Sequence, residues 1–296
     1  MSDQPHRAGF IAIVGRPNVG KSTLMNRLIG QKVSITSRKA QTTRHRINGI
    51  LTTPSAQFVF VDTPGFQTAF GGALNRVLNH NVTDSLGSVD VVVLVVEAGR
   101  FGERDVAVLR LVPVSLPVVL AINKIDRMPD KAALLPFIER VRGQRDFAAV
   151  VPLSAQTGIQ CPALIEAVQA LLPVGDSMYE DDQITDRSER FLAAEIVREK
   201  IFRLTGEEIP YGANVMVETF EVEGTMRRIG CLIVVGRANH KAMIIGAGGA
   251  RLKTIATEAR LDMERLFDGK VFLELWVKVD ANWSDNPKAL RKYGYG

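Results

Sequence analysis

Residues 15–23 have the side chains and spacing of a phosphate-binding loop. Gly15-Arg16-Pro17-Asn18-Val19-Gly20-Lys21-Ser22 fits the pattern G-x-x-x-x-G-K-[ST], and Thr23 follows it. The segment comes after a strand-like run and opens a helical one, which is the context this pattern requires. Backbone N–H groups of such a loop wrap phosphates at the positive end of a helix. We expect Lys21 to reach the β- and γ-phosphates of a nucleotide, and Ser22 to bind Mg²⁺.

A second motif, Asp62-Thr63-Pro64-Gly65, ends the next apolar run. The Asp62 carboxylate can hold Mg²⁺ through water, and the Gly65 N–H can meet a γ-phosphate. By itself this tetrapeptide could be a simple turn. Its position after a phosphate-binding loop favours a role in nucleotide binding.

Two further motifs could recognise a base. Asn123-Lys124-Ile125-Asp126 and Ser154-Ala155 each end an apolar run. The Asp126 carboxylate can accept hydrogen bonds from the N1–H and the exocyclic amine of guanine. Adenine offers neither donor in that arrangement and would leave a buried carboxylate unpaired. A backbone N–H of the Ser154-Ala155 pair could meet the guanine O6, although this dipeptide has no weight apart from the other motifs.

A switch loop is expected at Gln41-Thr42-Thr43-Arg44, between the first two motifs. A hydroxyl there would bind Mg²⁺ only while a γ-phosphate is present, which makes an order–disorder switch. We expect Thr43 to be this ligand, because related GTPases place the threonine just before an arginine; Thr42 is the alternative. Together these motifs resemble the GTPase set, and they predict GTP, GDP and Mg²⁺ as ligands.

Two residues depart from the pattern of many small GTPases. Phe66 stands after the second motif, where a glutamine often orients the attacking water, and a phenyl ring cannot do this. Slow intrinsic turnover, or help from a partner or an ion, follows as a hypothesis. Asn18 stands three residues before Lys21, where potassium-dependent relatives carry an asparagine that helps to hold K⁺.

Strands and helices that could position these motifs alternate along the first half of the chain. Nearly continuous apolar runs predict strands at 10–15, 58–65, 89–99, 116–126 and 149–155, and helical patterns lie at 21–28, 102–111, 131–142 and 159–171. Such alternation predicts a doubly wound α/β domain with a parallel sheet. Ligands of these sheets bind at the carboxyl ends of the strands, where all the motifs lie.

Composition and charge limit the number of domains, the kind of partner and the cellular compartment. A chain of 296 residues with 46% hydrophobic residues is expected to form two domains with substantial cores. The net charge of +5 does not by itself indicate a nucleic-acid partner, although residues 31–46 carry basic side chains and no acidic one. Two separated cysteines favour a reducing compartment. No signal peptide or membrane-length apolar run is visible, so we expect a soluble, cytoplasmic protein.

The second half predicts a smaller α+β domain. Residues 176–190 lose periodicity and read as a linker between domains at 1–175 and 191–296. A helix is expected at 188–203, capped by Asp186 or Ser188, followed by a hairpin that turns at Glu223-Gly224. Two helical segments and a final strand at 270–283 complete the order α, β, β, α, α, β.

The loop from Gly246 to Gly249 joins the two helical segments. It does not fit the dinucleotide pattern G-x-G-x-x-G, because Arg251 stands at the third glycine position. Its setting resembles the GXXG loop of a type II KH domain, which clamps single-stranded RNA. The residues expected at such an RNA site are Lys241, Ile244, Ile245, Gly246, Ala247, Gly248, Gly249, Arg251 and Lys253, with Ile255 in the groove and Arg260 adding charge.

Three features of this region leave alternatives open. KH loops often carry a basic residue between the glycines, and Ala247-Gly248 stand there instead, so Arg251 and Lys253 would supply the charge. A plain glycine-rich turn between helices is the alternative for the whole loop. Trp276 and Trp283 could stack on bases, although core positions are commoner for tryptophan on alternating strands.

The whole chain resembles the bacterial Era family, through QTTR at 41–44, DTPGF at 62–66, NKID at 123–126, ITDRSER at 184–190 and LWVKV at 275–279. The resemblance implies a GTPase that binds 16S rRNA near its 3′ end and assists assembly of the 30S ribosomal subunit. It also implies a P-loop GTPase domain followed by a KH domain, with Lys21, Thr43 and Gly65 in catalysis and Ser22, Thr43 and Asp62 around Mg²⁺. A monomer and peripheral association with the inner membrane are further expectations.

Other functions fit these motifs less well. A GTPase of tRNA modification would need a further catalytic domain, and a double-GTPase assembly factor would need a second phosphate-binding loop. Membrane-linked cell-cycle signalling is another alternative. A passive RNA-binding protein would leave the nucleotide motifs unexplained.

Overall fold

The computed structural model describes residues 5–36, 44–62, 86–206, 209, 212–281 and 283–293. The main division of the chain into two compact units falls between Asp186 and Arg187. Residues 176–186 of the expected linker therefore group with the first unit.

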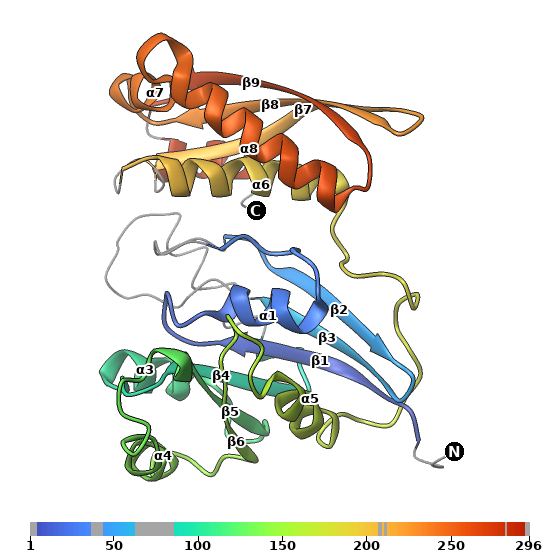
Figure 1. Cartoon of the computed structure of the whole chain (residues 1–296), viewed down its shortest axis with the longest axis vertical. Coiled ribbons are helices and arrows are strands. Elements are labelled where there is room, and N and C mark those ends of the chain that lie inside the picture. The colour runs from blue at the N-terminus through green and yellow to red at the C-terminus, as the bar shows by residue number, and fades with distance from the viewer. Residues whose placement is uncertain are drawn as a thin grey trace. The chain divides into compact units, whose positions relative to one another are not determined.

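The first unit contains a mixed sheet with the strand order β2-β3-β1-β4-β5-β6 (Figure 1). The strands are β1 (Arg7–Val14), β2 (Ile47–Thr53), β3 (Ala56–Asp62), β4 (Val91–Glu97), β5 (Val118–Asn123) and β6 (Ala149–Pro152). All neighbours run parallel except β2 and β3, which are antiparallel. Every residue of β3 and β5 is buried, as expected for strands covered on both faces.

Helices cover both faces of this sheet. They are α1 (Lys21–Ile29), α3 (Glu103–Leu111), α4 (Leu134–Arg142) and α5 (Cys161–Gln169), with a short turn η1 (Ile125–Arg127). Alternate residues of β4, Val92, Leu94 and Val96, share an apolar cluster with α3 and α4. The intervening residues of the strand point to the opposite face. The helices α1 and α5 pack on the sheet without joining that cluster, so they cover this second face.

The sequence patterns located most of these elements but missed β2. This edge strand mixes Asn48, Thr52 and Thr53 with apolar residues, so it lacks the continuous apolar run by which the other strands were recognised. The expectation of a purely parallel sheet is corrected by its antiparallel pairing with β3. The strand expected at 58–65 ends at Asp62 in the structure, and residues 63–65 lie outside the described residues.

The segment after α5 is fastened to the first unit. Ile50 N donates to Ile184 O at 2.9 Å, and the Asn48 side chain donates to Asp186 at 3.0 Å. Gln57, which is fully buried, accepts from the backbone N–H groups of Met178 and Tyr179 at 2.7 and 3.0 Å. The same amide donates to Tyr179 O and to Thr52. Residues 178–186 therefore lie against the sheet edge instead of forming a loose tether.

Gln57→Leu is expected to destabilise the first unit by about 1–3 kcal/mol, because it removes the partners of the partly buried N–H groups of Met178 and Tyr179. Urea denaturation measures this change. Gln144→Leu, at an exposed position, is the matched control and should change the stability by less than about 0.5 kcal/mol. Equal stability of the two variants would show that the buried amide does not hold this segment.

The second unit has the expected order of helices and strands. Its elements are α6 (Glu189–Leu204), β7 (Ala213–Glu223), β8 (Met226–Val235), α7 (Ala238–Ile245), η3 (Ala247–Gly249), α8 (Ala250–Leu266), β9 (Lys270–Val279), η4 (Trp283–Asp285) and α9 (Pro287–Lys292). The Ser188 hydroxyl caps α6 by accepting from Phe191 N at 3.3 Å, which confirms one of the two expected caps. The hairpin turns after Glu223, also as expected.

Its sheet has the order β7-β8-β9, with β7 antiparallel and β9 parallel to β8. The helices α6 and α8 lie on the same side of this sheet (Figure 1). Buried residues of both helices, such as Val197 and Ile255, form one core with Ile233 of β8. Within the described ranges, no helix combines the length and the apolar character needed to cross a membrane.

Candidate functional site

The loop after β1 has the backbone of a close-fitting cradle. Gly15, Asn18 and Gly20 have φ angles of 152°, 66° and 104°. A Cβ atom on Gly15 would lie 2.4 Å from Val95 O, and one on Gly20 would lie 2.4 Å from the Asn123 side chain. Glycine is therefore required at both ends of the loop by conformation and by space. Val19 is fully buried, so only its backbone could face a ligand.

Lys21 lies at the centre of this loop. Its Nζ donates to Gly15 O at 3.0 Å and to Arg16 O at 3.2 Å, and the residue is 7% exposed. Burial lowers the pKa of Lys21 to about 8, although the nearby Asp62 carboxylate acts in the opposite direction. A buried ammonium whose partners among the described residues are two carbonyl groups is well prepared to meet phosphate oxygens, which are stronger acceptors.

Ser22 and Asp62 lie together at the edge of the loop. The Ser22 hydroxyl donates to Asp62 Oδ2 at 2.8 Å, and the Ser34 hydroxyl donates to the same oxygen at 2.7 Å. Hydroxyl and carboxylate oxygens suit Mg²⁺, which is usually bound through one or two carboxylates completed by substrate phosphates. The adjacent Ser22 and Asp62 oxygens fit a site of that kind.

Asn123 joins three of the sequence motifs. Its Nδ2 donates to Val19 O at 2.8 Å, and its Oδ1 accepts from Ala155 N at 2.9 Å and from Lys124 N at 2.7 Å. One buried amide thus fixes the phosphate-binding loop, the end of β5 and the segment after β6. Ser154 and Ala155 are also buried, which leaves backbone groups as their means of contact with a ligand.

Lys124 forms the rim beside this amide. It has a left-handed φ of 68°, and its Nζ donates to Asn18 O at 2.7 Å. The same Nζ lies 3.1 Å from a carboxylate oxygen of Glu97, which also pairs with Arg16 at 3.2 Å. Burial acts to raise the pKa of Glu97, but the hydrogen bond and charge of Lys124, together with the charges of Arg16 and Arg100, lower the pKa. Asp126 lies in the short turn η1 that follows Lys124, and it is exposed.

Sequence reasoning missed the acids that hold Arg16. Besides Glu97, Asp105 Oδ1 lies 3.2 Å from Arg16 Nε, and burial raises the pKa of Asp105. The Arg16 side chain is thereby engaged with acids at the ends of β4 and α3, so its backbone is the part that could face phosphates. One sequence feature could have indicated a role for Glu97: it follows an apolar strand, and the motifs also lie at the carboxyl ends of strands.

Several expected site residues lie outside the described residues. These are Thr42, Thr43, Thr63, Pro64, Gly65 and Phe66.

The second glycine loop has an equally specific backbone. Gly246, Gly248 and Gly249 have φ angles of 73°, 55° and 81°. A Cβ atom on Gly246 would lie 2.8 Å from the Cβ of Arg251, whereas Gly248 faces open space. The loop reverses the chain between α7 and α8 and leaves Ala247 and Gly248 exposed at its tip. Backbone groups at this tip are accessible to an extended ligand.

The side chains around this loop divide into exposed and core positions. Lys253 and Arg251 are exposed, and Arg251 Nη1 donates to Met243 O. The expectation that Ile244 and Ile255 offer side-chain surface to RNA is corrected, because both are fully buried in the core of the second unit. The partly buried Ile245 retains accessible surface.

Three further side chains that the sequence offered for RNA contact can be placed. Arg260 pairs with Glu264 at 2.9 Å, which reduces the charge it could offer to phosphate. Trp283 is 1% exposed and belongs to the core, while Trp276 is 47% exposed.

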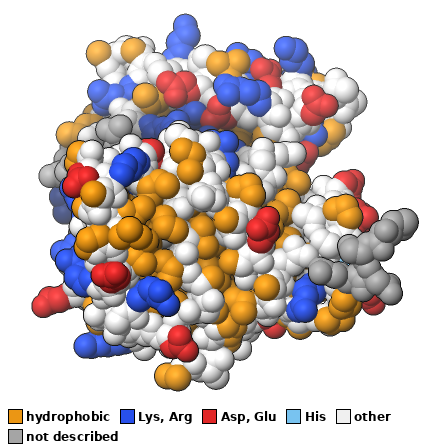
Figure 2. Space-filling view, turned by 60° about the horizontal axis from the view of Figure 1, so that its bottom comes forward, with side chains coloured by type: hydrophobic (Ala, Val, Ile, Leu, Met, Phe, Trp, Pro, Cys, Tyr) orange, Lys and Arg blue, Asp and Glu red, His pale blue; other side chains and the backbone are white. Residues whose placement is uncertain are grey.

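On the face drawn in Figure 2, basic and acidic side chains are interspersed among apolar ones. The net charge of +5 is therefore not gathered on that face. Local geometry at the glycine loop is the stronger indication of a phosphate-binding surface.

Comparison with known families matches both units. A family described as "50S ribosome-binding GTPase" matches residues 10–124, and a family described as "KH domain" matches residues 208–284. GTPase Era of Nitrosomonas eutropha is 57% identical over 295 residues, and the alignment covers 100% of this chain and 100% of that protein. GTPase Era of Chromobacterium violaceum is 56% identical over 294 residues, which cover 99% of each chain.

Two solved structures are similar over nearly the whole chain. A variant of Era from Aquifex aeolicus bound to GDP·AlF4⁻ is 38% identical, with a TM-score of 0.94 and coverage of 98% of this chain and 99% of that one. An Era complex with MgGDPNP and nucleotides 1506–1542 of 16S ribosomal RNA is also 38% identical, with a TM-score of 0.93 and the same coverage. These similarities extend across both units and the segment that joins them in sequence.

Proposed function

The chain belongs to the Era family of GTPases, and from this premise we propose that it uses GTP hydrolysis to control its binding to 16S rRNA near the 3′ end. Through this binding it assists assembly of the 30S ribosomal subunit. The observation that carries the proposal is the full-length similarity to an Era structure that holds MgGDPNP and nucleotides 1506–1542 of 16S rRNA. We assign nucleotide chemistry to residues 1–175, with residues 176–186 packed against the same unit, and RNA binding to residues 191–296.

For the nucleotide, we propose that the N–H groups of residues 15–23 bind the phosphates and that Lys21 exchanges its carbonyl partners for β- and γ-phosphate oxygens. Ser22 and Thr43 would hold Mg²⁺ directly, and Asp62 would hold it through water. When bound, the ion neutralises charge between the β- and γ-phosphates. Asp126 would recognise guanine. The Ala155 N–H donates to Asn123 Oδ1 in this structure, so it would exchange that acceptor for the guanine O6.

The activation of water needs a different explanation, because Phe66 cannot orient it. We propose that Lys21 and the N–H groups of the loop stabilise the charge that develops as water attacks the γ-phosphate in line. The Gly65 N–H would bind the γ-phosphate in the same state, and Thr43 would be ordered by it.

K⁺ is proposed as an additional ligand beside Asn18. Its left-handed backbone places this exposed residue on the rim of the loop, where its amide oxygen can reach a cation next to the phosphates. We expect GTP hydrolysis to be about tenfold faster in K⁺ than in Na⁺ at equal ionic strength, a small part of what an arginine finger supplies. Single-turnover rates measure this ratio. Asn18→Ala should reduce it, and identical rates in the two salts would contradict a role for K⁺.

For the RNA, we propose that the loop of residues 246–249 binds the phosphate backbone through the N–H groups of its exposed tip, Ala247 and Gly248, because those of Gly246 and Gly249 donate to Ala242 O and Gly246 O. Lys241, Arg251 and Lys253 would supply the charge that the tip of the loop lacks. The exposed part of Ile245 would contact a base. Ile244 supports the loop from inside the core.

The proposed function is tested with an RNA that spans nucleotides 1506–1542 of 16S rRNA. Its affinity for the full chain is measured by fluorescence anisotropy with GDPNP or GDP bound, beside an unrelated RNA of equal length. We expect the ribosomal RNA to bind more tightly than the unrelated one, and more tightly with GDPNP than with GDP. Equal affinity in all combinations would refute the proposal. Action in the cytoplasm belongs to this proposal, whereas a monomeric state and peripheral membrane association stay predictions of the family resemblance.

A further inference from the structure

The last turn of α1 carries an arginine that reaches the loop expected at the guanine base. Arg27 Nε donates to Ala155 O at 3.2 Å, and Arg27 Nη2 donates to Gln156 O at 2.5 Å. A Cβ atom on Gly158 would lie 3.7 Å from the Cδ of Arg27, so the stem of this side chain passes beside the same loop. Arg27 and Ala155 are 128 residues apart in the sequence. Arg27 therefore ties α1 to a distant loop, although it belongs to none of the sequence motifs.

The backbone of Ala155 is held on both its polar groups. Its N–H donates to Asn123 Oδ1 at 2.9 Å, and its carbonyl accepts from Arg27. Among the described residues, the hydrogen bonds that reach residues 154–158 from elsewhere in the chain come from these two side chains. The other hydrogen bonds of the segment close the loop on itself. When the Ala155 N–H exchanges Asn123 for the guanine O6, the bonds from Arg27 are the ones that still hold the loop.

The helix α1 connects this tether to the phosphate-binding loop. It begins at Lys21, which we expect at the phosphates, and Arg27 lies about 9 Å further along the helix axis. The helix is fixed on the sheet by its buried residues Leu24, Met25 and Leu28, and a closely packed interior resists a shift of such an element. One rigid helix therefore sets the position of the base loop relative to the phosphates.

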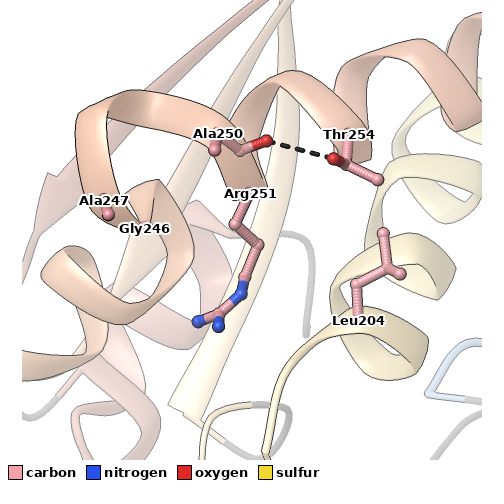
Figure 3. A pocket seen from close by; sticks show the side chains of 6 residues that line it. All are labelled: Leu204, Gly246, Ala247, Ala250, Arg251 and Thr254. Carbon is pink, nitrogen blue, oxygen red and sulfur yellow. Dashed lines mark hydrogen bonds between the residues drawn. The ribbon is translucent and has the colours of Figure 1, made fainter.

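A second arginine beside a ligand loop has fewer bonds to the backbone. In the second unit Arg251 extends from α8 beside the glycine loop, along a hollow of about 340 Å³ (Figure 3). Its Nη1 donates to one carbonyl, Met243 O. Arg27 instead binds the carbonyls of two consecutive residues through two nitrogens. Paired bonds from a planar guanidinium fix orientation as well as position, so Arg27 has the geometry that can fix a loop.

We propose that Arg27 is a positioning residue for guanine recognition, an inference that rests on the proposed function. By holding the carbonyls of Ala155 and Gln156, it keeps the Ala155 N–H aimed at the guanine O6 after that N–H has left Asn123. The contact of Asp126 with the N1–H and the exocyclic amine does not pass through Arg27, because Asp126 lies in η1 after β5. Loss of Arg27 therefore weakens recognition of O6 and spares recognition of the amine.

Nucleotide analogues separate these two contacts. In 6-thio-GDP the O6 atom is replaced by sulfur, which is a weak acceptor, and IDP lacks the exocyclic amine. Isothermal titration calorimetry measures the affinity of the full chain for GDP, 6-thio-GDP and IDP at a fixed Mg²⁺ concentration. We expect the wild type to prefer GDP over 6-thio-GDP roughly threefold to tenfold, the range for one neutral hydrogen bond. It should prefer GDP over IDP roughly 10- to 100-fold, the range for a hydrogen bond to a charged group.

Arg27→Met removes the guanidinium and keeps an apolar stem. It should reduce the preference for GDP over 6-thio-GDP to within about twofold and leave the preference for GDP over IDP unchanged. Single-turnover hydrolysis at saturating GTP should stay within about twofold of the wild-type rate, because Arg27 acts on the base loop and not on the phosphates. Arg142→Met is the matched control, since Arg142 is exposed in the last turn of α4 as Arg27 is in that of α1. It should behave like the wild type in every measurement.

The pattern of affinities decides between a positioning role and a structural one. A general loss of stability would lower the affinity of Arg27→Met for all three nucleotides by the same factor, and that result would overturn the proposal. An unchanged preference for GDP over 6-thio-GDP in this variant, or a wild type that binds both equally, would overturn it as well, while the proposed function stands. A wild type that does not bind GDP in preference to ADP would refute the proposed function itself.

Discussion

Lys21→Met is expected to reduce the rate of GTP hydrolysis by about 10²–10³-fold, the usual cost of removing one group that stabilises the transition state. Methionine retains the apolar stem of the side chain and removes the ammonium that contacts Gly15 O and Arg16 O. Those carbonyls lie within the phosphate-binding loop, where no other ammonium of the described residues approaches the two oxygens. Single-turnover hydrolysis at saturating GTP measures the loss in the chemical step.

Stability gives an independent readout of the same side chain. Burial lowers the pKa of Lys21 to about 8 from its ordinary value of 10.5. Between these pH values the unfolded state binds more protons than the folded state, so Lys21 makes the free energy of unfolding increase as the pH rises from about 8 to 10.5. Lys21→Met should lose this part of the increase, which chemical denaturation at several pH values would detect.

The same pKa predicts proton uptake when a nucleotide binds. Phosphate charge favours the protonated ammonium, so binding at a pH just above 8 should transfer a proton from buffer to Lys21. Lys288→Met, at an exposed position on α9, is the control and should leave hydrolysis unchanged. A Lys21→Met protein that hydrolyses GTP within threefold of the wild-type rate would contradict the assigned role.

The two glycine loops show which parts of the site the sequence could predict. Gly15 and Gly20 are required because β4 and the Asn123 side chain crowd them, and the spacing of the motif already marks both positions. Alternation of apolar strands and helices also placed the other motifs at one edge of the sheet. The spacing of a local motif predicts local backbone geometry well, because both depend on the same few neighbouring residues.

Contacts between distant segments could not be predicted in this way. Arg16 pairs with Glu97 and Asp105, which are 81 and 89 residues further along the chain and belong to no motif. The Asn123 amide reaches Val19 and Ala155, and nothing in the sequence indicates that it holds the loops rather than a ligand. Such roles depend on strand order, which neighbouring residues do not specify.

The burial of Ile244 could not be predicted from the sequence for a different reason. The helix α7 has only eight residues and contains adjacent isoleucines, so periodicity cannot decide which one faces the core. In the structure Ile244 is fully buried and Ile245 only partly, although both were equally good candidates for an RNA contact. A short helix beside a turn receives its orientation from packing on the sheet.

Gly246→Ala is expected to weaken RNA binding at least tenfold, whereas Gly248→Ala should weaken it no more than about threefold. Gly246 has φ 73° and ψ 175°, a region that is almost restricted to glycine, and a Cβ there would lie 2.8 Å from the Cβ of Arg251. Gly248 has φ 55° and ψ 22°, which other residues adopt at a cost of roughly 1–2 kcal/mol, and it faces open space.

These two variants form a matched pair, since each adds one methyl group to the same loop. RNA anisotropy with the probe of nucleotides 1506–1542 measures the difference, and the intrinsic GTPase rate should equal that of the wild type in both. If the loop presents its backbone to RNA phosphates, the variant that must rebuild the backbone loses affinity and the other retains it. Equal losses in both would mean that the methyl groups act by blocking the surface, and equal retention would mean that the loop is not the RNA contact.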